Sequence, residues 1–378
     1  MRLIYFIPLL STKGGQERTL VDKANWLVEK GHDVSFVTYA NDGSLAYPLN
    51  SKIKHVDLAC PFFHIYRLPF YKHFFAALKF KRIFRHKMKE VISAFQPDIV
   101  VVAIPLTEFF INDLVKISGN IPIVVESHLA CGYEPVARGL TEKVLDIFCS
   151  PQESICKTDL LVALTKGDAQ LWARYHHRVC VIPNPLTNFI TPIPCVEKSE
   201  GRILCVGRLS PQKRYDRMVN AFAMIADKYP NWHVDIFGGG QAQGTDVLNR
   251  HIQNKGLYGR VRLFPPVDDI YSEYLRSQFL VLSSDFEGFG LVVIEAMACG
   301  IPVVATDCPF GPSDIIDDGK TGLLAKMEET DLAEKIEWMI THEEERKRMG
   351  TLAYDASAKY RKDLIVPQWE KAYMSVIR

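Results

Sequence analysis

Short apolar runs, rich in β-branched residues, alternate along the chain with amphipathic stretches of helical length. In the first half these runs predict strands at 2–9, 32–39, 98–104, 121–127, 159–164 and 178–184. Between the first two runs, residues 16–30 predict a helix that ends at Gly31. Continuous β-branched runs of this kind are typical of parallel strands that are covered by helices on both faces.

The same alternation restarts after residue 184. It predicts further strands at 201–208, 232–238, 260–267, 278–284 and 301–307. Two successive runs of βα units predict an α/β protein with two Rossmann-like, doubly wound domains. The segment from Pro183 to Cys195 holds four prolines and little periodicity, so we expect the linker there. The expected domains are 1–185 and 186–364.

Composition narrows the class of protein. The 378 residues are 48% apolar and 24% charged, which is typical of a globular protein, and the net charge of +1 gives no overall attraction to nucleic acid. Nine cysteines without C-x-x-C or zinc-ligand spacing favour reduced thiols in a cytosolic protein. Residues 1–10 are apolar but lack a signal-peptide cleavage site, so we expect a strand there. No apolar run approaches the roughly 20 residues of a membrane span.

Two loops that follow predicted strands of the second half carry candidate chemistry. Ligands of open α/β sheets bind at the carboxyl ends of the strands, so these loops are where a site is expected. Arg208 and Lys213 lie five residues apart in the first loop and could bind one anionic group from two directions. The alternative is two solvated surface cations.

The second loop runs from Asp285 into a predicted helix that opens near 290–292 and carries Glu295. Its glycines allow a close backbone approach, and the free N–H groups at the helix start suit phosphate. Glu287 and Glu295 are acceptor-only carboxylates beside this turn, an arrangement that suits a phosphate-linked, polyhydroxylated ligand such as a nucleotide sugar. The alternatives are a turn residue at 287 and a partly buried salt-bridge residue at 295.

This second loop, SSDFEGFGLVVIEAMACGIPVVATD (283–307), resembles the E-x7-E segment of the retaining glycosyltransferases of family 4, which have the GT-B fold. VGRLSPQKRYD (206–216) resembles the donor-phosphate loop of that family, and GPSDIIDDGKTGLL (311–324) resembles the loop after its next strand. GGQERTL (14–20), VIPNPL (181–186) and VPQWEKAY (366–373) resemble its glycine loop, its domain crossing and its terminal helix. The motifs occur in the family's order along almost the whole chain.

The resemblance implies a GT-B enzyme whose two domains face each other across a cleft, with a C-terminal helix at 365–378 that completes the first domain. We also expect Pro367 to break or kink that helix. The implied reaction moves a sugar from a nucleotide diphosphate, UDP first and GDP second, to a glycan or lipid-linked acceptor in polysaccharide or glycoconjugate synthesis. The implied partners are thus the donor and the acceptor, with no cofactor and no nucleic acid.

The resemblance also implies roles for single residues. Arg208 and Lys213 bind the donor diphosphate, Glu287 contacts the sugar hydroxyls, and Glu295 holds the ribose. His128 is implied to contact the transferred sugar, and Gly14 and Gly15 the diphosphate. Pro266 and Val267 are implied to lie near the base. The backbone of Phe289, Gly290 and Leu291 is implied to contact the sugar and the phosphates. The chain has Asp314 where many relatives have glutamate, which puts in doubt any role that needs the longer side chain.

The sequence has no D-x-D triplet, the motif with which enzymes of the other large glycosyltransferase fold usually bind the metal ion on the donor diphosphate. We therefore expect no metal, and we expect fixed cations and backbone donors to offset the charge of the departing nucleotide. The retaining chemistry implied by the family is same-face attack, so no protein nucleophile is assigned.

A basic, aromatic segment at 62–89 is a candidate for docking on an anionic membrane surface at the cytoplasmic face. It contains no acidic residue, and its cations and aromatic residues are interleaved. The cations are Arg67, Lys72, Lys79, Lys81, Arg82, Arg85, Lys87 and Lys89, and the aromatic residues are Phe62, Phe63, Tyr66, Phe70, Tyr71, Phe74, Phe75, Phe80 and Phe84. The alternative is an ordinary helix pair with aromatic residues in the core and solvated cations.

Two other functions stay open at this point. A nucleotide-sugar epimerase or hydrolase of the same fold would turn over the donor without an acceptor. A non-catalytic nucleotide-sugar-binding subunit would bind the donor and release no nucleotide diphosphate. A dinucleotide-dependent dehydrogenase is disfavoured because no G-x-G-x-x-G follows a predicted strand.

Overall fold

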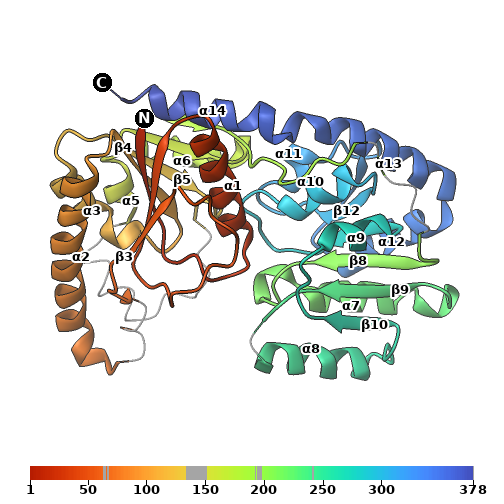
Figure 1. The fold of residues 1–378 in the computed structure, drawn as a ribbon. Coiled ribbons are helices and arrows are strands. Elements are labelled where there is room, and N and C mark those ends of the chain that lie inside the picture. Colours follow the sequence, from red (N-terminus) through yellow and green to blue (C-terminus); the bar gives the residue numbers. More distant parts are fainter. Residues whose placement is uncertain are drawn as a thin grey trace. The chain divides into compact units, whose positions relative to one another are not determined.

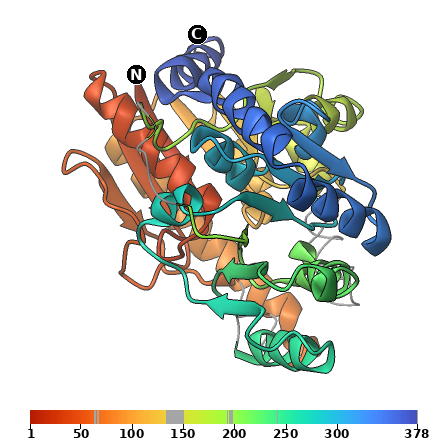
Figure 2. The same cartoon turned by 90° about the vertical axis from the view of Figure 1, so that its right-hand side faces the viewer.

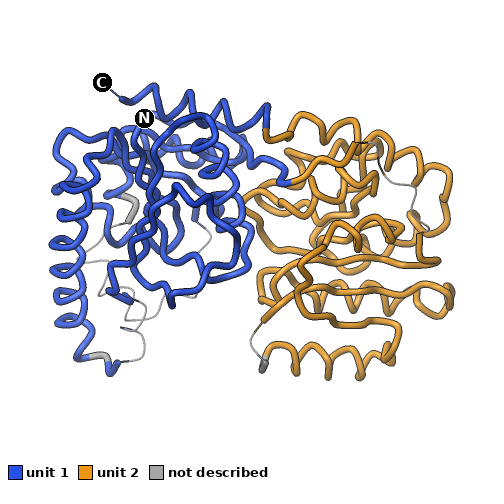
Figure 3. The backbone as a smooth tube through the Cα atoms, in the orientation of Figure 1, with its two compact units in different colours: residues 1–187, 363–378 blue, residues 188–362 orange. Residues whose placement is uncertain are grey.

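The computed structural model describes residues 1–62, 65, 68–132, 151–191, 193, 198–240 and 242–377. The chain forms two compact units, which are coloured separately in Figure 3. Unit 1 consists of residues 1–187 and 363–378, and unit 2 of residues 188–362.

Unit 1 is built on a seven-stranded parallel sheet in the order β3-β2-β1-β4-β5-β6-β7 (Figure 1). Its strands are β1 (Arg2–Phe6), β2 (Asp33–Thr38), β3 (Lys54–Asp57), β4 (Ile99–Ile104), β5 (Ile123–Ser127), β6 (Leu160–Ala163) and β7 (Val179–Val181). Its helices are α1 (Gly15–Glu29), η2 (Phe70–Lys72), α2 (His73–Phe95), α3 (Glu108–Ser118), α5 (Pro151–Ile155), α6 (Lys166–Trp172) and α14 (Lys362–Met374). The strand order reverses between β1 and β4.

Unit 2 is built on a six-stranded parallel sheet in the order β10-β9-β8-β11-β12-β13, which is the doubly wound order. Its strands are β8 (Arg202–Val206), β9 (His233–Phe237), β10 (Val261–Phe264), β11 (Phe279–Leu282), β12 (Val303–Thr306) and β13 (Gly322–Ala325). Its helices are η3 (Pro211–Lys213), α7 (Tyr215–Ala223), η4 (Ala226–Lys228), α8 (Ala242–Asn254), α9 (Ile270–Leu275), α10 (Leu291–Ala298), α11 (Pro312–Ile315), α12 (Glu329–Thr341), α13 (Glu343–Ser357) and η5 (Ala358–Tyr360).

The continuous apolar strands are buried on both faces, as their composition predicts. Every residue of β4, IVVVAI, is buried, and the neighbouring strands β1 and β5 are buried almost throughout. The helices cover these strands with one apolar face each, which for α2 consists of residues spaced three or four apart. This face carries Ala77, Phe84, Met88, Ile92 and Phe95, and the buried Lys81 continues the spacing between Ala77 and Phe84.

We expected Pro367 to break or kink the terminal helix, but α14 runs through Pro367 to Met374, so the proline does not break it. Proline removes one backbone hydrogen bond, but buried side chains before and after it, among them Val366 and Trp369, stabilise both halves of the helix. The Trp369 indole N–H also donates to the Pro183 carbonyl at 3.1 Å. Figures 1 and 2 show the start of the chain beside α14. A contact between the two regions joins His32 Nε2 to the Glu370 carboxylate at 2.6 Å.

Within the described ranges, no helix has both the length and the apolar character needed to cross a membrane. The seven described cysteines form no disulfide with one another. Cys149 and Cys195 lie outside the described residues.

Candidate active site

The candidate site of unit 2 lies where the strand order reverses. Strands β8 and β11 are neighbours there, and the loops that follow them, 207–214 and 283–290, leave the same edge of the sheet. Hydrogen bonds join the two loops, since the Asp285 amide donates to the Gln212 carbonyl at 2.9 Å and the Ser283 hydroxyl donates to the Lys213 carbonyl at 2.9 Å. The sheet topology therefore brings together two loops that lie about 70 residues apart in the sequence.

Lys213 and Glu287 form an ion pair between these loops. The ammonium Nζ lies 2.6 Å from Glu287 Oε1, and the Ser284 hydroxyl donates to the same carboxylate oxygen at 2.6 Å. The two charged side chains are only 14% and 8% exposed, so the pair is poorly screened by solvent. The structure therefore brings together one predicted cation and one predicted acid.

Arg208 is the exposed cation of the same loop. Its guanidinium makes no hydrogen bond or ion pair with the described residues. Gly207, just before it, has φ +151°, and a Cβ there would lie 3.1 Å from Cε of Lys213 and 3.1 Å from the Tyr215 hydroxyl. The backbone that carries Arg208 thus runs directly against the Lys213 side chain, which leaves the guanidinium available to a ligand beside the ammonium group.

A third loop, Gly238 to Gly240 after β9, packs against the first, and the sequence analysis missed it. A Cβ on Gly238 would lie 1.8 Å from the Gly207 carbonyl oxygen, and the Leu209 amide donates to the Gly239 carbonyl at 2.8 Å. Only glycine allows this approach of two backbones. The signal was present in the sequence, as three consecutive glycines at the end of the strand predicted for 232–238.

The predicted base-binding residues follow β10 at the same edge of the sheet. A Cβ on Gly239 would lie 3.1 Å from Cγ of Pro266, so the loop after β10 lies against the glycine loop. Val267, the next residue, is 37% exposed. The loops after three neighbouring strands, β8, β9 and β10, therefore meet on one side of the site.

Helix α10 begins at Leu291, directly after Gly290, so its first amides belong to the loop that carries Glu287. Gly290 has φ +95°, a conformation that favours glycine. Phe289 is buried and packs edge-on against Tyr360, with ring centroids 5.7 Å apart. Gly311 lets the next loop approach, because a Cβ there would lie 2.2 Å from the Phe289 carbonyl oxygen.

Glu295 lies on the buried face of α10, with 2% of its surface exposed. Its Oε2 accepts a hydrogen bond from the buried Tyr274 hydroxyl at 2.9 Å. The Tyr274 hydroxyl thus holds the Glu295 carboxylate inside unit 2. At the start of α7, burial raises the pKa of the Tyr215 hydroxyl, and Cys205, Glu287 and Tyr274 raise it further.

The predicted residues of unit 1 follow strands β1 and β5. Gly14 precedes α1, and a Cβ there would lie 2.1 Å from Oε2 of Glu17. His128 follows β5, its side chain is 2% exposed, and its Nε2 lies 2.9 Å from Oε2 of Glu126. Burial lowers the pKa of His128, which Glu126 opposes, and Glu17 is close enough to contribute. Gly15 is the first residue of α1, so both predicted glycines belong to its start.

Asp168 fixes the loop that follows His128. Its Oδ1 accepts a hydrogen bond from the Cys131 amide at 2.7 Å, and its Oδ2 is buried without a hydrogen-bond partner among the described residues. Burial raises the pKa of Asp168 to about 6, although the hydrogen bond from the Cys131 amide opposes the shift.

This raised pKa predicts a pH dependence of stability. The folded protein holds the Asp168 proton more tightly than the unfolded chain, so the contribution of Asp168 to stability falls as the pH rises from the usual value of 3.8 to about 6. Relative to Asp168→Asn, the wild type is expected to lose on the order of 2 kcal/mol of unfolding free energy between pH 4 and pH 7. Chemical denaturation at both pH values measures this, and parallel curves for the two proteins would contradict it.

The segment at 62–89 divides into core and surface residues. Phe62 and Phe84 are buried core residues, Lys81 lies 3.5 Å from Asp113, and the Lys87 ammonium donates to the Leu58 carbonyl at 2.7 Å. The exposed side chains gather at the start of α2 and on its outer face, and they are Tyr71, Lys72, Phe74, Phe75, Leu78, Lys79, Arg82, Arg85 and Lys89. Phe63, Tyr66, Arg67 and the side chain of Phe70 lie outside the described residues.

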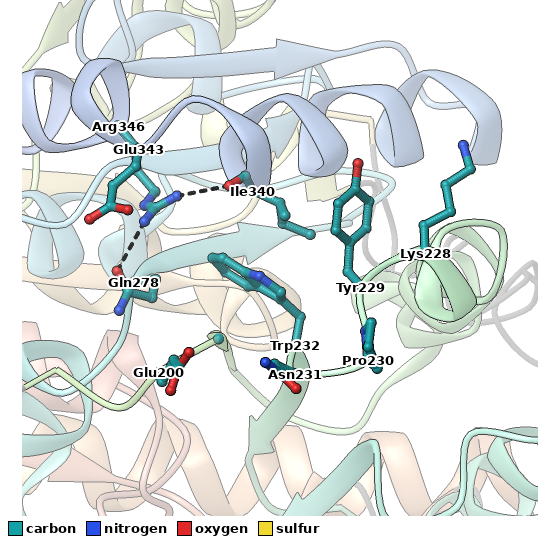
Figure 4. A pocket seen from close by; sticks show the side chains of 11 residues that line it. Glu200, Lys228, Tyr229, Pro230, Asn231, Trp232, Gln278, Ile340, Glu343 and Arg346 are labelled. Atoms are coloured by element: carbon teal, nitrogen blue, oxygen red, sulfur yellow. Dashed lines mark hydrogen bonds between the residues drawn. The ribbon is translucent and has the colours of Figure 1, made fainter.

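Figure 4 shows a groove of about 520 Å³ in unit 2, between Trp232, Gln278 and Arg346. The Arg346 guanidinium donates to Gln278 Oε1 at 3.3 Å and lies 5.3 Å from the Trp232 ring. Trp232 and Gln278 directly precede β9 and β11, so the groove lies at the amino ends of the strands. Ligands of doubly wound sheets bind at the opposite, carboxyl ends, where the candidate site lies.

In the part of the chain that the structure describes, no three His, Cys, Asp or Glu side chains are arranged to hold a metal ion.

Two protein-family models match the chain. "Glycosyltransferase Family 4" matches residues 13–187, and "Glycosyl transferases group 1" matches residues 193–356. Two curated relatives align over 97% of this chain and 98% of their own length. They are an uncharacterized glycosyltransferase of Haemophilus influenzae, 26% identical, and the amylovoran biosynthesis glycosyltransferase AmsD of Erwinia amylovora, 23% identical.

Solved structures share the fold. Sucrose-phosphate synthase from Thermosynechococcus elongatus superposes with a TM-score of 0.80 at 19% identity, over 99% of this chain and 98% of its own. S. aureus TarM, solved with UDP, superposes with a TM-score of 0.76 at 16% identity, over 98% and 99% of the two chains. Anabaena HepE, solved with UDP and glucose, superposes with a TM-score of 0.75 at 18% identity, over 99% and 100%.

Proposed function

We propose, from the premise that this chain is a nucleotide-sugar-dependent glycosyltransferase of the family 4 type with the GT-B fold, that it retains the configuration of the sugar and works without a metal ion. The observation that carries this proposal is the pairing of Lys213 with Glu287 beside the exposed guanidinium of Arg208, which has no partner among the described residues. Two fixed cations on one loop can offset the charge of a departing diphosphate, which is the task that a metal performs elsewhere. The carboxylate beside them can accept hydrogen bonds from sugar hydroxyls.

The donor that we propose is a UDP-sugar. The structures of TarM and HepE contain UDP, which supports this carrier for a chain of the same fold. In the proposed assignment, Arg208 and Lys213 bind the two phosphates, Glu287 the sugar, and Glu295 the ribose. The Tyr274 hydroxyl, which donates to Glu295, would keep that carboxylate in one orientation.

In the proposed reaction the bond between the anomeric carbon and the phosphate oxygen breaks, and its electron pair leaves with the nucleotide diphosphate. An acceptor hydroxyl attacks the same face of the sugar and gives its proton to the departing phosphate. Arg208 and Lys213 stabilise the negative charge that develops on that oxygen, and His128 accepts a hydrogen bond from a hydroxyl of the transferred sugar.

The donor assignment predicts the outcome of a thermal-shift panel. UDP-sugars are expected to raise the unfolding temperature by mass action, whereas Glu295→Ala and Lys213→Ala should each weaken this shift. Loss of a charge-assisted hydrogen bond corresponds to roughly 10-fold to 100-fold weaker binding. Lys228→Ala is the control. Lys228 is exposed and lines the groove at the amino ends of the strands, whereas the candidate site lies at their carboxyl ends. Equal shifts in all four proteins would refute the assignment.

Acceptor dependence separates transfer from the alternatives. A transferase releases UDP faster when its acceptor is added, an epimerase or hydrolase does not need one, and a binding subunit releases none.

We also propose that the exposed start of α2 docks on an anionic membrane surface, where a lipid-linked acceptor would be found. Tyr71 and Phe75 are 71% and 72% exposed, and Lys72 and Lys79 lie beside them on the outer face. Exposed aromatic rings that alternate with lysines suit the interface of a bilayer with acidic headgroups.

Vesicle sedimentation tests this surface. The protein is expected to sediment with anionic phosphatidylglycerol vesicles and not with neutral phosphatidylcholine vesicles. Reversal of Lys72 and Lys79 to glutamate should lower the bound fraction at least tenfold, since each lysine near such a surface contributes about 1 kcal/mol. Reversal of Lys228 and Lys255, two exposed lysines of unit 2, to glutamate serves as the matched control. Equal sedimentation with both vesicle types would rule the surface out.

A further inference from the structure

A buried polar network in unit 1 surrounds the histidine assigned to the sugar. Glu126 and His128 lie two residues apart at the end of β5, so their side chains leave the same face of the strand. The two side chains are 0% and 2% exposed, and His128 Nε2 lies 2.9 Å from Glu126 Oε2. Neither group is in contact with bulk solvent.

This contact determines which imidazole nitrogen carries the proton. An ionised carboxylate only accepts hydrogen bonds, so Nε2 must be the donor. In the neutral ring the lone pair then lies on Nδ1. Nδ1 is buried and has no hydrogen-bond partner among the described residues, and such an atom is expected to pair when a ligand arrives.

Side chains from two other elements, α1 and α14, hold Glu126 directly. Lys23 of α1 lies 2.6 Å from the same Oε2, and the Tyr373 hydroxyl of α14 donates to Oε1. Tyr5 of β1 lies 3.0 Å from the Tyr373 hydroxyl, and the Trp369 ring covers the Lys23 ammonium at 3.5 Å. Every oxygen of the carboxylate therefore has a partner, and the side chain has one orientation.

We propose that Glu126 is a positioning residue for His128: it accepts the hydrogen bond of the Nε2–H group and so presents Nδ1 as the acceptor for a hydroxyl of the sugar substrate, while Lys23 and Tyr373 fix Glu126 in place. This inference rests on the proposed function, because it assigns the ligand of Nδ1 to the sugar. The network makes the terminal helix α14 part of the apparatus that orients His128.

Nitrogen-15 histidine NMR tests the tautomer without any measurement of activity. In wild-type protein, His128, assigned by its loss in His128→Ala, is expected to show a protonated Nε2 and an unprotonated Nδ1. The double variant Lys23→Met/Glu126→Leu removes both charges together, and in it these two signals should move toward the values of exchanging tautomers. Tyr373→Phe keeps both charges and should produce a smaller change. Lys81→Met/Asp113→Leu removes another ion pair of unit 1 and should leave the signals unchanged.

Turnover distinguishes positioning from a structural role. With UDP-glucose and UDP-N-acetylglucosamine as probes, Lys23→Met/Glu126→Leu should lower UDP release roughly 10-fold to 100-fold, by analogy with residues that orient metal-binding histidines. Added to His128→Ala, the same double change should have no further effect, because both changes remove one function. Multiplicative losses, or His128 signals equal to those of the wild type, would overturn the positioning role. A fully active His128→Ala would instead overturn the sugar contact of the proposed function, whatever the tautomer.

Discussion

Replacement of Arg208 by alanine is expected to reduce turnover by about 10²–10³-fold, the loss seen when one fixed donor to a developing negative charge is removed. The guanidinium is exposed and makes no hydrogen bond or ion pair with the described residues, so it contributes little to the fold. We therefore expect the unfolding free energy without ligand to change by no more than about 0.5 kcal/mol, as for an ordinary surface substitution, and the unfolding temperature to stay close to that of the wild type.

The measurement is UDP release at saturating donor, together with the unfolding temperature. Arg250→Ala, on the exposed side of α8, is the control for loss of an arginine in unit 2. Lys213→Ala provides the contrast, since it removes a cation and also leaves the buried carboxylate of Glu287 without its partner. It should lower both turnover and stability. An Arg208→Ala protein with unchanged turnover would exclude this arginine from the reaction.

Glu126→Ala is expected to destabilise unit 1 by about 3–5 kcal/mol, because it leaves the Lys23 ammonium buried without its counter-ion. Burial alone would raise the pKa of Glu126, but Lys23 and His128 outweigh it and hold that pKa below its usual value. The contribution of the ion pair is thus complete above the usual carboxyl pKa, and it is lost as the pH falls below that value.

Chemical denaturation at neutral pH measures this loss. The matched control is Lys23→Met/Glu126→Leu, since removal of both charges together leaves no uncompensated ion and is expected to be nearly neutral. A single variant as stable as the double variant would mean that water reaches the ammonium group and that the pair is not buried in solution.

The strands could be predicted from sequence wherever they are buried on both faces. All six runs of the first half and all five of the second form strands. The two strands that were missed have physical reasons. Lys54–Asp57 lies at the edge of its sheet and is only partly buried, so its residues do not form an apolar run. Gly322–Ala325 begins with a glycine that the approach of the neighbouring strand requires, because a Cβ there would lie 2.4 Å from the Val303 carbonyl oxygen.

The residues of the site that lie within one loop could be predicted from the sequence, but the contacts between loops could not. Arg208, Lys213 and Glu287 were each expected at the carboxyl end of a strand, and the structure has them there. The hydrogen bond between Lys213 and Glu287 could not be predicted from spacing, because it depends on the pairing of β8 with β11. The network around Glu126 could not be predicted either, because the Tyr5 and Tyr373 hydroxyls that meet in it are 368 positions apart in the sequence.

The packing of α14 against Lys23 affects how unit 1 can be expressed without unit 2. A fragment that stops at residue 187 would lack Trp369 and Tyr373, and it would expose to water a lysine and a glutamate that are otherwise fully enclosed. Expression of the first half should therefore graft residues 363–377 onto its end through a flexible spacer. An affinity tag placed directly after Val376 would disturb the packing of this residue, whose side chain is buried.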